Sequence, residues 1–441
     1  MTIWRLQQGA DKRVRGGHPW IFSNELSVSP KGHIPGASIT LQDSKGAFLA
    51  HGYGNPHSLI AFRAVSFDQK AEDCLAVESL VQKVISAWGH RRLLGYQHSF
   101  RLVFGECDFL PGLVIDRYLL ESGQQVLAIQ ISTAGMEKAL ADIEYFSRRV
   151  VEEAFETGLC RINWANSCVV LRADMNVRKL EGLEVKQPLV IKAIEGVDLK
   201  NSWVHVDAIG FSPNEGQSLK GAEKPIAMKC DLFEGQKTGF FLDQSWNIEI
   251  LGQLLKRNPH FESPVRILDL CCYVGQWSTK LTRLLKNMGF EVEVELVDVS
   301  ASALAFAKEN AEREGARVLA RELDVMEELG KLPDRHYDIV IADPPAFIKS
   351  KKDLPIGKHA YLKFNTQAFR LANKGGLVVS CSCSGLLPEE ELKDAVRKSI
   401  QRNHLQARVV GKGGHAPDHP TLVSFPESAY LKMLVHQVAF H

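Results

Sequence analysis

The regular alternation of apolar strand segments with helical segments, from about residue 226 onward, constrains the fold more than any other feature. The apolar runs are Val265–Leu270, Val292–Val297, Tyr337–Ala342 and Gly376–Ser380, and the helical patterns between them begin at Trp277, Ser300 and Tyr361. Such alternation is typical of an α/β domain with a parallel, doubly wound sheet. Because these sheets bind ligands at the carboxyl ends of their strands, the strand ends are where functional residues are expected.

The rest of the chain predicts two further domains, in keeping with its length of 441 residues. Residues 1–70 contain short strand-like pieces broken by glycine and proline, which indicates a small β-rich module. A helical pattern begins near Glu72, and the following region combines a strand at Gln125–Ile131 with a helix around Met136–Ala154. This pattern predicts an α+β domain that ends in a turn-rich segment at Pro213–Pro225. The expected domains are 1–70, 72–225 and 226–441.

Composition narrows the possible functions. Lys and Arg total 53 and Asp and Glu total 52, so a nucleic-acid role must rest on local basic patches. The sequence has no run of 18 apolar residues and no signal-peptide pattern at its start, which predicts a cytoplasmic protein without a membrane span. The nine cysteines are expected to be reduced. None has the paired spacing of a zinc site, so no metal is expected.

A cofactor site is expected where the first two strands of the alternation end. Asp269 lies at the end of the first strand, and Gly275 opens the helix that follows. The next strand ends in Asp298, which is placed to accept hydrogen bonds from ribose hydroxyls, and Ser300 is expected to cap the next helix. A structural turn with a solvated aspartate is the alternative for each residue taken singly.

The loop after the first strand decides between two cofactors. Residues 271–276 lack the three-glycine fingerprint that lets a backbone approach a pyrophosphate, which disfavours NAD. S-adenosylmethionine (SAM) has no pyrophosphate and is therefore favoured. Cys271 and Tyr273 belong to this loop, and Asp324 follows the third strand, where an acid can hold the adenine amino group. An exposed, merely solvated Asp324 is the alternative.

Two residues at the ends of the next strands suggest the chemistry. Asp343 follows the strand Tyr337–Ala342, and two prolines after it fix the backbone as the chain leaves the sheet. Cys383 leaves the following strand in a turn rich in serine and glycine, and a thiolate there can attack C6 of a pyrimidine and make C5 nucleophilic. For Cys381 a structural role is preferred, and Cys271 and Cys272 can equally be inert, small apolar residues.

Several motifs together resemble the RlmI-type cytosine-C5 methyltransferases of 23S ribosomal RNA. The matching runs are His18–Ser23, Asp108–Arg117, Val177–Leu183, Glu234–Gln244, Asp343–Phe347, Ser382–Leu386, Asp418–Pro420 and Tyr430–Lys432. The resemblance implies an N-terminal PUA-type RNA-binding barrel, a central α+β domain and a C-terminal class I (Rossmann-like) SAM-dependent methyltransferase domain. It also implies that Cys383 is the nucleophile and that Asp343 steadies the cytosine ring. Gln236, Lys237 and Phe240–Gln244 match the run beside the cofactor and target pocket, which gives Phe240 and Gln244 a cofactor role.

Local positive charge suggests how RNA would be held. Residues 349–363 contain a single acid, Asp353, and five lysines: Lys349, Lys351, Lys352, Lys358 and Lys363. This positive segment fits a phosphate clamp but equally a solvated surface. Arg13 and Arg15 are further candidates, because the first seventy residues carry eight basic and four acidic side chains. Lys237 is also a candidate for RNA contact. The expected partner is 23S ribosomal RNA, and a homodimer is a candidate assembly.

Two other functions remain open at this point. The Asp-Pro-Pro turn at Asp343 resembles that of enzymes that methylate a base nitrogen, although such chemistry needs no cysteine nucleophile. From a different class, the chain could be a non-catalytic, RNA-binding ribosome assembly factor. The joint presence of Asp269, Asp298, Asp343 and Cys383 argues against that function.

Overall fold

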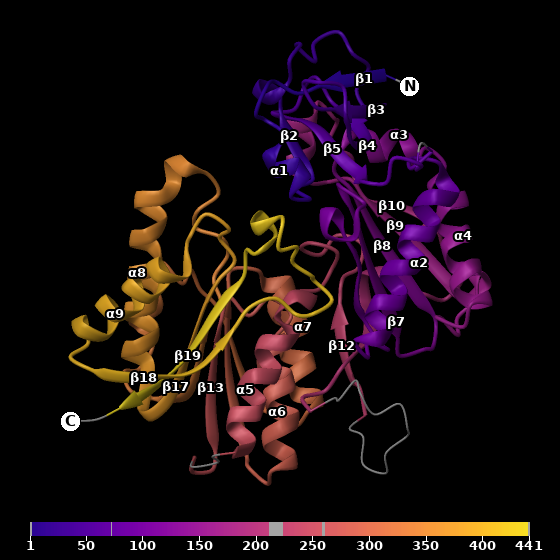
Figure 1. The fold of residues 1–441 in the computed structure, drawn as a ribbon. Coiled ribbons are helices and arrows are strands. Elements are labelled where there is room, and N and C mark those ends of the chain that lie inside the picture. The colour runs from indigo at the N-terminus through magenta and orange to yellow at the C-terminus, as the bar shows by residue number, and fades with distance from the viewer. Residues whose placement is uncertain (1, 72, 211–223, 258–260, 440–441) are drawn as a thin grey trace. The chain divides into compact units, whose positions relative to one another are not determined.

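The structure is a computed structural model that describes residues 2–71, 73–210, 224–257 and 261–439. It divides into two compact units, each built from several stretches of chain (Figure 1). The first unit contains Met1–Val204, Asp231–Phe240 and Pro417–Ser428. The second contains His205–Cys230, Phe241–Ala416 and Ala429–His441. Two short stretches after residue 226, Asp231–Phe240 and Pro417–Ser428, thus belong to the first unit. The domain boundaries expected from the sequence stay predictions.

An N-terminal sheet opens the first unit, with the strand order β1-β3-β4-β5-β2. Its strands are β1 (Thr2–Arg5), β2 (Trp20–Phe22), β3 (Ala37–Gln42), β4 (Phe48–Gly54) and β5 (Ile60–Ser66), and a short helix, α1, spans Lys12–Arg15. The strand-like pieces expected here are therefore real strands. Their buried side chains, among them Trp4, Ile39 and Phe62, form a small core of their own.

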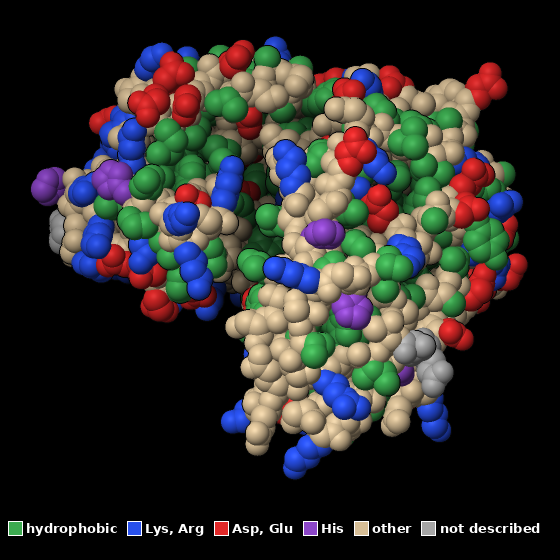
Figure 2. Space-filling model, turned by 90° about the horizontal axis from the view of Figure 1, so that it is seen from above, with side chains coloured by type: hydrophobic (Ala, Val, Ile, Leu, Met, Phe, Trp, Pro, Cys, Tyr) green, Lys and Arg blue, Asp and Glu red, His purple; other side chains and the backbone are tan. Residues whose placement is uncertain are grey.

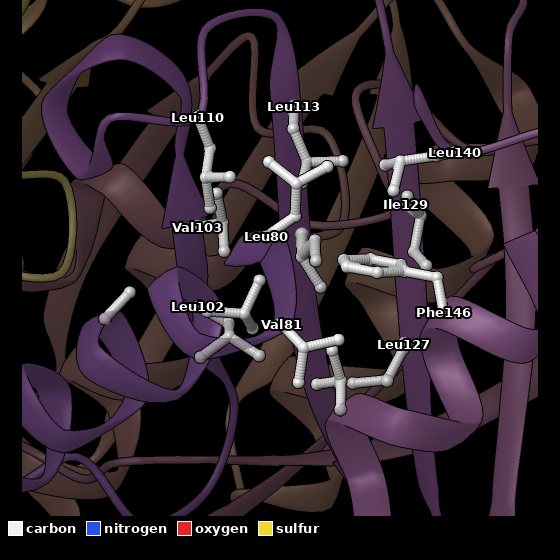
Figure 3. Close-up of a cluster of buried hydrophobic side chains, with 14 of the residues drawn as sticks. Leu80, Val81, Leu102, Val103, Leu110, Leu113, Leu127, Ile129, Leu140 and Phe146 are labelled. Carbon is white, nitrogen blue, oxygen red and sulfur yellow. The ribbon is translucent and has the colours of Figure 1, made fainter. Parts of the chain in front are cut away.

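A second sheet has the strand order β10-β9-β8-β7-β11-β12, with β6 beside β7. Its last strand, β12 (Ile226–Cys230), belongs to the second unit. The other strands are β6 (Phe100–Phe104), β7 (Leu113–Leu120), β8 (Gln125–Ile131), β9 (Ser167–Arg172), β10 (Leu189–Lys192) and β11 (Ser202–Val206). The helices are α2 (Val77–Leu93), α3 (Ala134–Ala139) and α4 (Ile143–Glu156). Figure 3 shows the core, in which Leu80 and Val81 of α2 and Phe146 of α4 point toward the sheet residues Leu127 and Ile129. Burial of this apolar layer stabilises the central α+β domain.

Buried polar contacts connect the two sheets of the first unit. The Arg63 guanidinium on β5 lies 2.8 Å from Glu106 and 2.9 Å from Glu181, and all three side chains are largely buried. The hydroxyl of Tyr53 on β4 donates to the Pro111 carbonyl at 2.7 Å. Removal of one partner of such a buried ion pair leaves an uncompensated charge, so this network fixes the N-terminal sheet against the central domain.

The second unit has the doubly wound sheet that the alternating sequence predicts, with the strand order β15-β14-β13-β16-β17-β19-β18. The strands of this sheet are β13 (Val265–Leu270), β14 (Val292–Asp298), β15 (Arg317–Glu322), β16 (Tyr337–Ala342), β17 (Ala372–Ser382), β18 (Gln406–Gly413) and β19 (Lys432–Ala439). Its helices are α5 (Ser245–Arg257), α6 (Gln276–Asn287), α7 (Ala301–Arg313), α8 (Leu354–Leu371) and α9 (Glu389–Arg402). Helices α5, α6 and α7 cover one face of the sheet, and α8 and α9 cover the other (Figure 1).

Several local expectations were wrong. The helix expected from about Glu72, a residue outside the described part, begins at Val77, and the helix expected over Met136–Ala154 is two helices. The second of these starts where the Asp142 carboxylate accepts from the Tyr145 amide at 2.9 Å, an N-cap that apolar periodicity does not reveal. Helix α8 begins seven residues before Tyr361, at Leu354, with a proline in its first turn.

The C-terminal strands were not predicted. β19 pairs antiparallel with β17 and with β18, which adds an antiparallel edge to the parallel sheet. Of the exit expected at Pro213–Pro225, residues up to 223 lie outside the described part of the chain. Among the described residues, no helix has the length and apolar character needed to cross a membrane.

Candidate active site

The sheet register brings the predicted site residues of the second unit to one edge. Leu270 on β13 pairs with Val297 on β14 and with Ala342 on β16, and Ala342 pairs in turn with Ser380 on β17. All four strands are parallel, so their carboxyl ends meet at the same edge of the sheet. The residues that follow these pairs are Cys271, Asp298, Asp343 and Cys381.

The loop after β13 is wound tightly around the Asp298 carboxylate. Asp298 accepts from the Tyr273 amide at 2.9 Å and from the Ser300 amide at 3.0 Å. Cys271, Tyr273 and Gly275 have φ angles of 58°, 49° and 72°, which lie in the left-handed region. A Cβ at Gly275 would lie 3.0 Å from the Ala307 Cβ on α7, so a close approach of the two backbones requires glycine here.

The first turn of α7 is capped as the sequence predicts, and a buried carboxylate contacts the first turn of α6. The Ser300 hydroxyl accepts from the Ala303 amide at 3.3 Å, which confirms Ser300 as the N-cap of α7. At the start of α6 the Asp269 carboxylate accepts from the Ser278 amide at 3.2 Å through Oδ2. Its other oxygen, Oδ1, is buried without a hydrogen-bond partner among the described residues. Burial, with a smaller contribution from Asp343 and Asp298, raises the pKa of Asp269 to about 7.

The surroundings of the Cys271 side chain are acidic. Burial raises the pKa of the Cys271 thiol well above its ordinary value, and negative charge on Asp298, Asp343, Asp269 and the exposed Asp324 raises it further. The Cys271 thiol therefore stays protonated at neutral pH. Acidic surroundings suit a cationic ligand, and SAM carries a positive sulfonium and a positive amino group. The orphaned Asp269 oxygen offers an acceptor for such a ligand.

Asp343 is oriented by two donors from the same unit. Its Oδ2 accepts from Nε2 of Gln244 at 2.8 Å and from the indole N–H of Trp277 at 3.2 Å. Gln244 is itself oriented by Asn247, whose amide nitrogen lies 2.6 Å from its oxygen. Sequence reasoning assigned Gln244 to the site but gave Trp277 no role. The sequence signal that could have predicted this role is an aromatic residue in the first turn of the helix after the cofactor loop.

Cys383 lies beside the turn that Asp343 opens. Its Sγ is 3.8 Å from the Pro344 carbonyl oxygen, and its side chain is partly exposed. The flanking serines are tied to Tyr361 on α8, whose hydroxyl lies 2.8 Å from the Ser382 hydroxyl and 2.9 Å from the Ser384 hydroxyl. The thiol is thus held on a fixed turn next to Asp343, the arrangement expected of a nucleophile and its partner.

The neighbouring Cys381 differs in its surroundings. It is fully buried, and burial together with the charge of Asp343 raises the pKa of its thiol well above the ordinary value. A structural role fits Cys381 better than a nucleophilic one. All nine cysteines are free thiols, and Cys271 and Cys383 are the two that are not buried. Across the described residues, no group of three or more His, Cys, Asp or Glu side chains could hold a metal ion.

The remaining predicted residues belong to the first unit or to the surface. Phe240 is fully buried in the first unit, and the Lys237 carbonyl there accepts from Gln130 at 3.2 Å, so their site roles stay predictions. Arg13 pairs with Glu25 at 3.3 Å, and Arg15 pairs with Asp11 and Asp43 at 2.5 and 2.6 Å. These acids offset the arginine charges, which weakens the case for phosphate contacts.

The lysine run after Asp343 divides into two groups. Lys358 pairs with Glu391 at 2.8 Å and Lys363 pairs with Glu327 at 3.3 Å. Lys349, Lys351 and Lys352 are exposed. In the view of Figure 2, Lys and Arg side chains are interspersed with Asp and Glu across the face, without a single large patch of one sign. On this face a phosphate clamp would rest on a few lysines, in keeping with the near-zero net charge.

Comparison with known proteins gives the family. A family model described as a PUA-like domain matches residues 5–67, and one described as a methyltransferase domain matches residues 261–422. Ribosomal RNA large subunit methyltransferase I of Photobacterium profundum is 30% identical over 437 residues, which cover 97% of each chain. The chain belongs to this RlmI-type family. The protein of the same name from Tolumonas auensis is 29% identical over 442 residues, 98% of each chain.

Solved structures agree on the fold. A methyltransferase solved in complex with S-adenosylhomocysteine (SAH) aligns with a TM-score of 0.72 at 17% identity, over 99% of this chain and 100% of that one. A SAM-dependent methyltransferase from Streptococcus mutans aligns with a TM-score of 0.71 at 16% identity and the same coverage. This RlmI-type protein thus has an N-terminal PUA domain, a central domain and a C-terminal class I methyltransferase domain, and its cofactor is SAM. The expected fold class and cofactor are confirmed.

Proposed function

We propose that this protein methylates C5 of a cytosine in 23S ribosomal RNA through a covalent bond between Cys383 and C6 of the base. The observation that carries the proposal is the place of Cys383, whose Sγ lies 3.8 Å from the carbonyl of Pro344, next to Asp343. Relatives along nearly the whole chain are named as large-subunit ribosomal RNA methyltransferases, which supports this RNA as the substrate.

A covalent step is needed because C5 of cytosine is a poor nucleophile while the ring stays aromatic. The Cys383 thiolate adds to C6, and the electron pair of the C5–C6 double bond becomes available at C5. When bound, SAM supplies the methyl group that C5 accepts. A base then removes the C5 proton, the C5–C6 double bond re-forms, and the thiolate leaves. The thiolate is regenerated, so cysteine is neither oxidised nor consumed.

Asp343 is proposed to hold the N3/N4 edge of the ring while the thiolate adds. A carboxylate oxygen of Asp343 can accept from the N4 amino group, and a proton held between the Asp343 carboxyl group and N3 neutralises the negative charge that develops toward N3. Gln244 and Trp277 bond to the same carboxyl oxygen of Asp343, which fixes the plane of the carboxyl group. Pro345 and Ala346 carry no titratable group, so the turn after Asp343 does not itself supply the base that takes the C5 proton.

The substrate must present its target base outside a helix. A base in structured RNA has to be flipped out to reach an enclosed pocket, and phosphate contacts elsewhere must hold the strand. The PUA-like domain and the exposed lysines 349, 351 and 352 are proposed to supply these contacts. Ribosomal RNA as substrate agrees with the cytoplasmic location expected from the sequence. The homodimer considered there stays a prediction.

Nucleoside mass spectrometry of 23S ribosomal RNA tests this function. RNA is compared from cells that lack the gene and from the same cells complemented with the wild-type chain, with Cys383→Ala or with the matched control Cys381→Ala. We expect one 5-methylcytosine with the wild type and Cys381→Ala, and none with Cys383→Ala. A methyl group on a base nitrogen would instead establish the alternative enzyme. Identical RNA in all samples would contradict both and favour the non-catalytic assembly factor.

A further inference from the structure

A lysine of β19, a strand that was not predicted from the sequence, is hydrogen-bonded to the turn that carries Cys383. Lys432 is the first residue of β19, and the antiparallel register places it opposite Ser382 on β17. Its ammonium group donates to the Ser384 carbonyl at 2.8 Å and to the Tyr430 carbonyl at 3.1 Å. The lysine is therefore paired across the sheet with the residue before Cys383 and bonded to the residue after it.

We propose that Lys432 is a positioning residue that holds the Cys383 turn and places a fixed positive charge where it stabilises the thiolate. The inference rests on the proposed function, in which Cys383 must lose its proton before it attacks. The thiol of an ordinary cysteine is mostly protonated at neutral pH, and a nearby cation favours the thiolate. Unlike a ligand, a lysine bonded to two backbone carbonyls supplies that charge before any cofactor or RNA binds.

The charge of Lys432 is coupled to that of Cys383. Burial lowers the pKa of the Lys432 ammonium, whereas a negative charge on Cys383 raises it, with Glu389 of α9 acting in the same direction. Because this interaction is mutual, a positive Lys432 favours the charged form of Cys383. Glu389 is itself paired with Lys393 and Lys412 at 2.8 Å each, so much of its charge is already balanced.

Two further titratable groups interact with Cys383, and neither of them carries a positive charge. Tyr361 of α8 interacts with Cys383 and is held neutral, because burial raises its pKa. Cys381 on β17 is a buried thiol whose pKa is raised by burial, by Asp343 and by Cys383. Of these three groups, Lys432 is the one whose charge favours a thiolate at Cys383.

The test measures the ionisation of Cys383 in the full-length chain without RNA. The rate of alkylation by iodoacetamide is followed from pH 6 to pH 10 by peptide mass spectrometry, which separates Cys383 from Cys271 and the buried cysteines. Lys432→Gln keeps donors for the two carbonyls but removes the charge, and Lys432→Arg keeps the charge. Lys412→Met is the matched control, because it removes a lysine that also neighbours Glu389.

We expect the apparent pKa of Cys383 to rise by about one unit or more in Lys432→Gln, in line with the effect of a neighbouring opposite charge. It should stay near the wild-type value in Lys432→Arg and in Lys412→Met. An unchanged pKa in Lys432→Gln would overturn the inference, as would equal rises in Lys432→Gln and Lys412→Met. If Lys432→Gln does not fold, a raised pKa in Lys432→Arg would overturn it.

Covalent trapping separates this inference from the proposed function. If wild-type protein forms no Cys383-dependent adduct with RNA that carries 5-fluorocytosine, the proposed function fails whatever the alkylation shows. If the wild type forms the adduct but Lys432→Gln alkylates with the wild-type pH profile, only the role of Lys432 fails.

Discussion

The indole N–H of Trp277 donates to the carboxylate of Asp343 across 3.2 Å, and so joins the first turn of α6 to the end of β16. The same carboxyl oxygen accepts from Gln244, so two donors from different segments fix one acid. This contact connects the loop proposed to bind the cofactor with the group proposed to hold the target base. Preorganised donors of this kind keep an acid in position without reorganisation during the reaction.

Loss of the Trp277 donor is expected to slow methylation while the fold is retained. Trp277→Phe keeps most of the buried ring but removes the N–H, which leaves Gln244 as the donor to that oxygen. We expect kcat to fall roughly ten-fold, the effect of one charge-assisted hydrogen bond. The matched control is Trp246→Phe, an indole on α5 that is 46% exposed. A Trp277→Phe protein with the kcat of the control would show that the contact does not orient Asp343 for catalysis.

The sequence predicts strands β13, β14 and β16 well because each is a short, largely buried run that ends at or next to a candidate site residue. Asp298 and Asp343 were placed at the edge of the sheet in this way, since their positions depend only on the strand before them. Ser300 was found as a cap because capping is a local interaction. By contrast, Trp277 contacts Asp343 and Lys432 contacts Ser384, partners that lie more than forty residues away in the chain. Strand β19, which carries Lys432, follows β18 without an α-helix between them, so the alternation does not predict it.

Cofactor affinity is expected to depend on Asp298. Each of its oxygens accepts one backbone amide, and a carboxylate oxygen has further lone pairs for the ribose hydroxyls of SAM. We expect Asp298→Ala to weaken binding of SAM and SAH by about ten- to hundred-fold, the range for hydrogen bonds to a charged group. Isothermal titration calorimetry measures both ligands. Glu322→Ala is the control, because Glu322 pairs with Asp298 in the sheet register on β15. Equal affinities of the two variants for SAM and SAH would show that Asp298 does not bind the ribose.

Stability of the second unit is expected to fall below pH 6.5 because of one buried histidine. His436 on β19 is 2% exposed and packs against Phe369 with ring centroids 5.5 Å apart. Burial lowers its pKa from 6.5 to about 4. A depressed histidine pKa means that the folded state resists protonation, so stability is complete above pH 6.5 and is lost progressively toward pH 4.

The measurement is the free energy of unfolding by urea at pH 7.5 and pH 5.5. The wild type should lose about 1 kcal/mol more than His436→Gln between these values, since each pKa unit corresponds to about 1.4 kcal/mol. His359→Gln replaces an exposed histidine on α8 and should keep the full pH dependence. The same pH dependence in His436→Gln as in the wild type would contradict the assignment.

Binding of ribosomal RNA is expected to involve the exposed lysines of the loop before α8. Replacement of Lys349, Lys351 and Lys352 together by alanine should weaken binding and lower the slope of log affinity against log salt by roughly two to three. Cofactor affinity should stay unchanged, because these three lysines are exposed and follow the Asp343 turn in the chain. Fluorescence anisotropy at several salt concentrations gives the slope.

The control for this loop removes the same charge elsewhere. Lys331, Lys393 and Lys398 are each paired with an acid three or four residues away on the chain, and their joint replacement by alanine should leave RNA affinity nearly unchanged. Equal salt slopes for the two triple variants would show that the loop is only a solvated face.

The central claim is that Cys383 forms a covalent bond to its target cytosine. RNA with 5-fluorocytosine at the target position tests it directly, because fluorine at C5 replaces the proton that must leave before the thiolate is released. The wild-type protein and Cys381→Ala, each supplied with SAM, should give a protein–RNA band of equal strength on a denaturing gel. Cys383→Ala should give none. A band that survives in Cys383→Ala, or that disappears in Cys381→Ala alone, would contradict the account.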